Sequence, residues 1–118
     1  MLRALLLENL HPLASSVLKA QGIEVETRSG ALDESELFEA LQGVQLLGIR
    51  SKTQVTARVL AEAGDLLAIG AYCIGTNQIE LGAASRAGIA TFNAPFSNTR
   101  SVVELAVAEI IALTRRLT

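Results

Sequence analysis

Two cations and two hydroxyl groups follow one another at Arg50, Ser51, Lys52 and Thr53, directly after an aliphatic run. An arginine guanidinium binds carboxylate or phosphate in a fork, and a lysine adds a compact positive charge. Each charged hydrogen bond to an anion contributes about 1.5–3 kcal/mol. The segment therefore predicts an anion-binding site that uses Arg50, Ser51 and Lys52, although the same spacing also fits a solvated basic turn.

Two further segments carry polar groups that are suited to binding. Residues 72–77 include Gly75, which allows close backbone approach, just before a predicted helix whose free N–H groups favour an anion. Residues 93–100 form a long polar loop whose hydroxyl and amide side chains can orient a ligand. Spacing alone favours a plain strand-to-helix turn for the first segment, and capping of the next helix accounts for part of the second.

The single histidine and the single cysteine give weaker signals. His11 precedes Pro12 at a predicted helix start, and Glu8 is the only nearby carboxylate that would serve it in proton transfer. We interpret His11 as a helix-entry residue. Cys73 has no base near it in sequence, which favours packing over nucleophilic chemistry. No Cys/His cluster has metal-ligand spacing, so the sequence predicts no metal site in this chain.

Several phosphate-binding fingerprints are missing from the sequence. Neither G-x-G-x-x-G nor G-x-x-x-x-G-K-[ST] occurs, so no dinucleotide or mononucleotide motif is present. Arg50 stands where a receiver domain needs its phosphorylated aspartate. Residues 8–12 do not form the Ser/Thr/Gly-rich phosphate loop of a flavodoxin.

Five short apolar runs alternate with helical patterns along the chain. Asp33 with Glu36 and Asn77 with Glu80 form capping-box patterns, and glycines close the helices. The expected strands are Ala4–Leu7, Ile23–Glu26, Val44–Ile49, Leu66–Ile69 and Ile89–Phe92, and the expected helices begin near Pro12, Asp33, Thr56, Asn77 and Ser101.

This alternation predicts an α/β fold. We expect a flavodoxin-like, doubly wound parallel sheet of five strands in the order 2-1-3-4-5, with helices on both faces. Ligands bind such sheets beyond the carboxyl ends of the strands, where the order reverses. The loops 8–11, 50–53, 71–77 and 93–100 are therefore expected to lie near one another at that edge.

Composition excludes several classes of protein. The 118 residues suffice for one domain with its own core. The net charge of −2 argues against a nucleic-acid partner. No apolar run approaches the ~18 residues of a membrane span, and a single cysteine fits a reducing compartment. We expect a cytoplasmic protein without nucleic-acid or membrane partners.

In the helix expected from Ser101, the apolar residues between Val102 and Leu113 point nearly all round the axis, and Glu104 and Glu109 are the only strongly polar residues. A helix of this kind is a buried helix, and this domain's sheet would cover only one of its sides. We therefore expect the chain to be the N-terminal piece of a longer protein. The alternative is a stand-alone, non-catalytic binding or dimerisation module that pairs two such helices.

Several stretches resemble the D-2-hydroxyacid dehydrogenase family, in collinear order over essentially the whole chain. The resemblance is closest to the branch that oxidises 3-phosphoglycerate to 3-phosphohydroxypyruvate with NAD, the first step of serine biosynthesis. The most specific stretch runs from Phe92 to Val102 and continues at Glu104-Leu105; shorter ones are Gly30–Asp33, Gly48–Thr53, Ala68–Gly70 and Cys73–Gln78.

The resemblance implies a two-domain enzyme with its active site in the cleft between the domains. Residues 1–98 would be the N-terminal part of the substrate-binding domain. Residues 99–118 would be a crossover helix toward an NAD-binding domain and the subunit interface of a homodimer or homotetramer. The family's catalytic His, its Glu partner and its substrate-orienting Arg lie downstream, so the 118-residue chain alone is expected to be inactive.

The resemblance also assigns binding roles. Arg50 and Lys52, with Ser51 between them, would face the phosphate or carboxylate of a 2-hydroxyacid. Ile74 and Gly75 would bind the substrate carboxylate through their backbone. Asn98 would contact the substrate near the nicotinamide of NAD, and Val102 would pack beside that ring.

Two positions depart from the family's bacterial pattern. Ser29 stands where those enzymes carry a lysine, with Arg28 one place earlier, and Lys52 replaces a common arginine. Phosphate recognition is therefore open to change, and another 2-hydroxyacid remains an alternative substrate.

Overall fold

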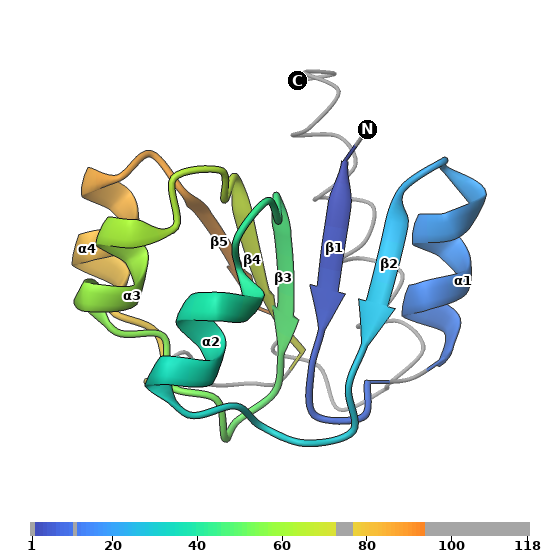
Figure 1. Ribbon diagram of the computed structural model, residues 1–118, viewed down its shortest axis with the longest axis horizontal. Helices are drawn as coiled ribbons and strands as arrows, with labels where there is room; N and C mark the ends of the chain where they lie inside the picture. The colour runs from blue at the N-terminus through green and yellow to red at the C-terminus, as the bar shows by residue number, and fades with distance from the viewer. Residues whose placement is uncertain (1, 11, 73–76, 94–118) are drawn as a thin grey trace.

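Strands and helices alternate along the part of the chain that the computed structural model describes, residues 2–10, 12–72 and 77–93 (Figure 1). The helix expected from Ser101 lies outside these residues. The strands are β1 (Arg3–Leu6), β2 (Glu24–Thr27), β3 (Leu46–Ile49), β4 (Ala68–Ala71) and β5 (Ala90–Asn93); the helices are α1 (Pro12–Ala20), α2 (Glu34–Ala40), α3 (Ala57–Glu62) and α4 (Leu81–Arg86).

The five strands form one parallel sheet in the order β2-β1-β3-β4-β5, which confirms the predicted topology. In the register of the sheet, Ala4 of β1 lies between Val25 of β2 and Leu46 of β3. The arrowheads in Figure 1 point to one edge, where the chain leaves each strand. Because β1 has β2 on one side and β3 on the other, the loops after these three strands emerge together.

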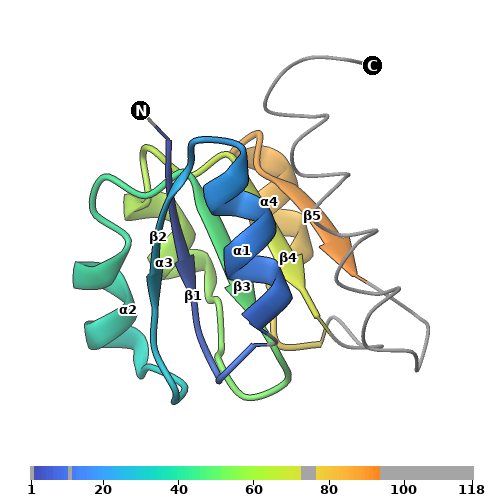
Figure 2. The same cartoon turned by 90° about the vertical axis from the view of Figure 1, so that its right-hand side faces the viewer.

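Helices cover both faces of the sheet, as Figure 2 shows with α1 in front and α2, α3 and α4 behind. Alternation along the strands divides the core between these faces. Leu5, Leu47 and Ile69 pack on the side of the three helices. On each of these strands, the positions next to Leu5, Leu47 and Ile69 face α1. The buried residues on that side are Ala4, Leu6, Ala14, Leu18, Ile23, Leu46, Ala68 and Tyr72.

Gly48 leaves space for other side chains on the α1 face near the carboxyl edge. A Cβ at this position would lie 2.7 Å from Leu6 Cδ2, 3.0 Å from Leu10 Cδ1 and 3.2 Å from a ring carbon of Tyr72. The missing side chain therefore allows Leu10 and Tyr72 to lie across β3. The Tyr72 hydroxyl is buried without a hydrogen-bond partner among the described residues, and burial raises its pKa to about 12.

Two local signals in the sequence specify helix starts correctly. At α2, the N–H of Glu36 donates to Asp33 Oδ1 at 2.8 Å, and the N–H of Asp33 donates to Glu36 Oε1 at 3.2 Å. This is the predicted capping box. At α3, the Thr56 hydroxyl accepts from the N–H of Val59 at 3.3 Å.

The capping box predicted at Asn77 and Glu80 is wrong. Glu80 does occupy the position before α4, but its side chain makes no capping hydrogen bond. Asn77 lies in a turn, and Ile79 forms a parallel bridge with Val55 rather than belonging to the helix. The local pattern predicted that Ile79 belongs to the first turn of a helix. Ile79 pairs with Val55 instead, and the helix begins at Leu81.

Gly48→Ala is expected to lower the free energy of unfolding by about 1–3 kcal/mol, because the added methyl group overpacks the space beside Leu6. Gly64→Ala is the matched control: a Cβ there meets no atom within 4 Å, and the expected change is below ~1 kcal/mol. Urea unfolding of both variants measures the difference. Equal stability of the two would contradict the packing argument.

Candidate functional site

The loops after β1 and β2 are joined at the carboxyl edge of the sheet. Glu8 and Asn9 follow β1 in the left-handed region, with φ of 63° and 53°. This bend lets the N–H of Glu8 donate to Gly30 O at 3.2 Å and the N–H of Asn9 donate to Arg28 O at 3.2 Å. The chain direction after β1 is therefore set by backbone bonds to the neighbouring loop.

The same bend directs the Glu8 side chain beneath the loop that follows β3. Its Oε2 accepts from the N–H groups of Arg50 at 2.8 Å and Thr53 at 3.1 Å, and its Oε1 accepts from the N–H of Lys52 at 2.8 Å. Only 8% of Glu8 is exposed. One buried carboxylate thus holds three of the four amides in the predicted anion-binding segment.

Two opposing effects set the charge state of Glu8. Burial is the largest single effect and raises the pKa of the carboxyl, because the charged form loses solvation. The hydrogen bonds from Lys52, Arg50 and Thr53 together outweigh it and leave the pKa below its ordinary value of 4.5. The buried Thr53 hydroxyl is close enough to add to this lowering, although it does not reach full hydrogen-bond geometry. Glu8 is therefore ionised at neutral pH.

A cavity of about 300 Å³ lies against this loop and is lined by Glu8, Ser29, Gly30, Ala31, Arg50, Ser51 and Lys52. Arg50, Ser51 and Lys52, the predicted ligands, are exposed and border it together. Two cations against one carboxylate leave the lining with a positive excess. The arrangement suits a small anion that Arg50 binds in a fork and Lys52 attracts as a point charge.

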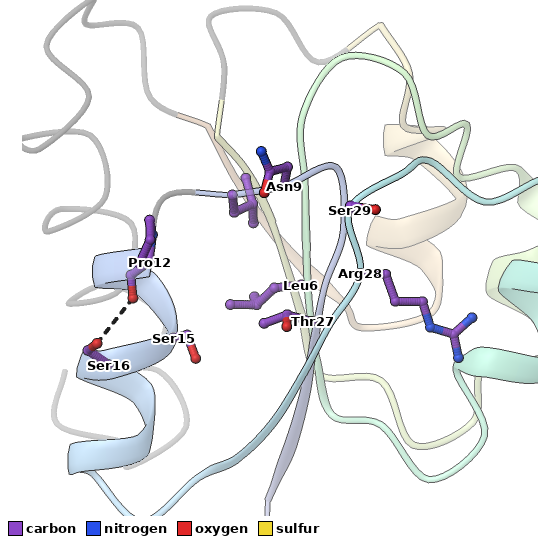
Figure 3. Close-up of a pocket in the computed structure, with 9 residues that line it drawn as sticks. Leu6, Asn9, Pro12, Ser15, Ser16, Thr27, Arg28 and Ser29 are labelled. Carbon is purple, nitrogen blue, oxygen red and sulfur yellow. Dashed lines mark hydrogen bonds between the residues drawn. The ribbon is translucent and has the colours of Figure 1, made fainter.

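A second cavity, of about 400 Å³, lies between the start of α1 and the ends of β1 and β2 (Figure 3). Apart from Arg28, its polar side chains are neutral: Asn9, Ser15, Ser16, Thr27 and Ser29. Arg28 also borders it, but its side chain points away in Figure 3 and pairs with Glu26 at 2.7 Å. Arg28 therefore does not replace the positive charge of the lysine that the family's bacterial pattern has at position 29.

Gln78 holds the loop after β3 through the carbonyl of Arg50, whereas Glu8 holds it through N–H groups. Its Nε2 donates to the carbonyl of Arg50 at 2.7 Å, and 7% of the residue is exposed. The carbonyl of Gln78 in turn accepts from the N–H of Val55 at 2.7 Å. The segment that begins at Asn77 is thereby attached to the Arg50 loop.

The structure places only part of the predicted site. Arg50, Ser51 and Lys52 lie together, whereas the remaining predicted ligands and the lone histidine and cysteine lie outside the described residues: His11, Cys73, Ile74, Gly75, Asn98 and Val102. In the sequence, Glu8 is predicted only as a partner for His11, and no role is predicted for the Gln78 side chain. The one available signal for Glu8 was a carboxylate directly after a buried strand, at the point where the sheet order reverses.

Within the described ranges, no group of three His, Cys, Asp or Glu side chains is placed to hold a metal ion. Over those same ranges, no helix combines the length and hydropathy that crossing a bilayer requires.

Comparison with known proteins identifies the family. Residues 4–116 match the family described as D-isomer specific 2-hydroxyacid dehydrogenase, catalytic domain. The chain therefore belongs to the D-isomer specific 2-hydroxyacid dehydrogenase family.

Relatives show the same similarity in more detail. D-3-phosphoglycerate dehydrogenase 1 of Saccharomyces cerevisiae is 50% identical over 116 residues, which cover 98% of this chain and 25% of that protein. D-3-phosphoglycerate dehydrogenase of Escherichia coli K12 is 46% identical over 115 residues, 97% of this chain and 28% of that protein. The crystal structure of TT0316 protein from Thermus thermophilus superposes with a TM-score of 0.76 at 29% identity, covering 98% of this chain and 38% of that one. The chain thus spans about a quarter of the length of these curated relatives.

Glu8→Gln is expected to lower the free energy of unfolding at pH 7 by roughly 1–3 kcal/mol, because an amide has one acceptor oxygen for three donors. The pKa of Glu8 is lowered in the folded state, so its stabilisation is present above the ordinary value of 4.5 and is lost as the pH falls through the folded value. The difference between wild type and variant should therefore shrink in acid.

Urea unfolding between pH 3 and pH 7 measures this difference. Glu24→Gln, the same change on the exposed face of β2, is the control and should shift stability little at any pH. A Glu8→Gln deficit that is independent of pH would show that the charge of Glu8 is not what stabilises the loop.

Proposed function

We propose that the intact protein is an NAD-dependent dehydrogenase that oxidises 3-phosphoglycerate to 3-phosphohydroxypyruvate, the first step of L-serine biosynthesis. The observation that carries this proposal is the identity of 46–50% with D-3-phosphoglycerate dehydrogenases over nearly the whole chain. The cavity beside Arg50 and Lys52 supports it, because it offers cations to a phosphorylated acid. Another D-2-hydroxyacid is the alternative substrate.

In this proposal the chain binds and orients the substrate. The Arg50 guanidinium forms a fork with the anionic end, Lys52 adds charge, and the Ser51 hydroxyl donates a further hydrogen bond. From the family resemblance, the backbone of Ile74 and Gly75 binds the carboxylate, and Asn98 contacts the substrate near the nicotinamide. The acid–base residues belong to a part of the enzyme downstream of this chain.

NAD, when bound, supplies the hydride acceptor for this oxidation. The described residues do not fit a dinucleotide: the charged cavity is small, and no glycine-rich phosphate fingerprint follows a strand. We therefore assign NAD binding mainly to a domain outside this chain, with Val102 as the contact that this chain makes to the nicotinamide.

The proposal extends to the organisation of the intact protein. Residues 1–98 form the first part of the substrate-binding domain, and residues 99–118 form a crossover helix toward the NAD-binding domain. That helix contributes to the interface of a homodimer or homotetramer, and the enzyme works in the cytoplasm. The partial coverage of the curated relatives supports one element of this proposal, namely that the intact protein is longer than this chain.

The positive charges proposed to bind phosphate do not include one at position 29, where the family's bacterial pattern has a lysine. Ser29 borders the cavity without a charge, and Arg28 is engaged with Glu26. Among the described residues, both cations of the cavity therefore come from one loop, which gives Arg50 and Lys52 a larger share of the binding.

The intact protein is expected to reduce NAD to NADH with 3-phosphoglycerate in preference to unphosphorylated 2-hydroxyacids. Absorbance of NADH in a steady-state assay measures this, with mass spectrometry of the native polypeptide to establish its length. The 118-residue chain alone should give no turnover. Absence of NADH with every phosphorylated and plain 2-hydroxyacid would refute the proposed function.

Arg50→Ala in the intact enzyme is expected to raise KM for the phosphorylated substrate about tenfold or more, because a charged hydrogen bond of ~1.5–3 kcal/mol is lost. Arg58→Ala is the matched control, since that exposed arginine on α3 lies outside the lining of the cavity. An unchanged KM in the Arg50 variant would show that this side chain does not contact the substrate.

A further inference from the structure

The peptide of Arg50 is held at both ends while its side chain stays exposed. Its N–H donates to Glu8 Oε2 at 2.8 Å, and its carbonyl accepts from Gln78 Nε2 at 2.7 Å. Glu8 and Gln78 are both buried, whereas Arg50 is exposed. The backbone is thus fixed from inside the molecule, and the guanidinium remains available at the cavity.

Glu8 also determines which groups of the loop remain for a ligand. A run of converging backbone amides is a common device for binding phosphate. Here Glu8 accepts from the amides of Arg50, Lys52 and Thr53, so these donors are already engaged. Within this loop, the groups that Glu8 does not engage are the side chains of Arg50, Ser51 and Lys52 and the N–H of Ser51, so an anion at the loop depends mainly on these side chains.

The backbone around Gln78 is itself held by hydrogen bonds to Val55. The bridge between Val55 and Ile79 places Gln78 beside the end of the Arg50 loop. The N–H of Val55 donates to Gln78 O at 2.7 Å, and the N–H of Glu80 donates to Val55 O at 3.0 Å. These bonds connect the Arg50 loop to the segment that follows residue 76.

We propose that Glu8 and Gln78 are positioning residues that hold the Arg50–Thr53 backbone so that the side chains of Arg50 and Lys52 bind the anionic end of the substrate. This inference rests on the proposed function, because it assigns the source of that enzyme's affinity for its phosphorylated acid. Neither residue needs to touch the substrate, since both act through the backbone of the loop.

Two near-isosteric variants of the intact enzyme test the proposal. Glu8→Gln leaves one acceptor for three donors, and Gln78→Met removes the donor to Arg50 O with little change of volume. Each should raise KM for 3-phosphoglycerate about tenfold, with KM for NAD unchanged within about twofold. The preference for phosphorylated over plain 2-hydroxyacids should fall in parallel.

Matched controls separate positioning from loss of structure. Glu24→Gln repeats the first change on an exposed strand position. Gln42→Met removes a bond of the same chemical kind on the exposed surface, from Gln42 Nε2 to Phe38 O at 3.2 Å, away from the cavity. A merely structural role would lower kcat for all substrates together without a selective rise in KM. That result, or equal effects in the controls, would overturn the proposal.

A second measurement stays decisive if the intact enzyme produces no NADH. Inorganic phosphate is titrated into the intact protein, and the NMR signal of the Arg50 guanidinium reports binding. The dissociation constant should rise about tenfold in Glu8→Gln and stay unchanged in Glu24→Gln. Wild-type binding without NADH would refute the proposed function alone. Equal phosphate affinity of wild type and Glu8→Gln, or no binding to either, would refute the positioning role.

Discussion

A buried carboxylate under three backbone amides is the interaction on which the described site depends. Removing Glu8 from water is costly, and the three N–H bonds offset that cost only if the loop after β3 adopts one shape. The carboxylate reaches that loop because Glu8 and Asn9 take left-handed backbone conformations directly after β1. The charge of one residue thus specifies the backbone of a segment more than forty positions away in the sequence.

The sheet order makes this contact possible. Placing β3 beside β1 puts the residue after one strand within reach of the loop after the other. The missing side chain at Gly48 then allows Leu10 and Tyr72 to close the α1 face just beneath the edge. The side chains packed at Gly48 and the hydrogen bond to the N–H of Arg50 therefore fix positions only two residues apart, at the end of β3.

The sequence predicted the features that local chemistry controls. Short apolar runs between helical patterns predicted the strands, and right-handed crossovers predicted their order. The Asp33 and Thr56 caps were correct because their bonds span three residues. The Asn77–Glu80 cap failed because pairing of Ile79 with Val55 outweighs a local cap. The role of Glu8 was not predictable from spacing, since its partners lie 42–45 positions away and backbone amides carry no sequence signature.

The lowered pKa of Glu8 makes this residue a structural anion rather than a group that transfers protons. A general base works best when its pKa lies near the working pH. The three amide bonds to Glu8 hold the pKa of its carboxyl below the ordinary value of 4.5. It is therefore poorly suited to take a proton from a hydroxyl group, although it borders the cavity. Its charge is used to shape the loop, and under the proposed function the acid–base group comes from a part of the enzyme outside the described residues. Under the proposed function, the described residues contribute substrate binding, and the position of the Arg50 cation depends on the neighbouring Glu8 anion.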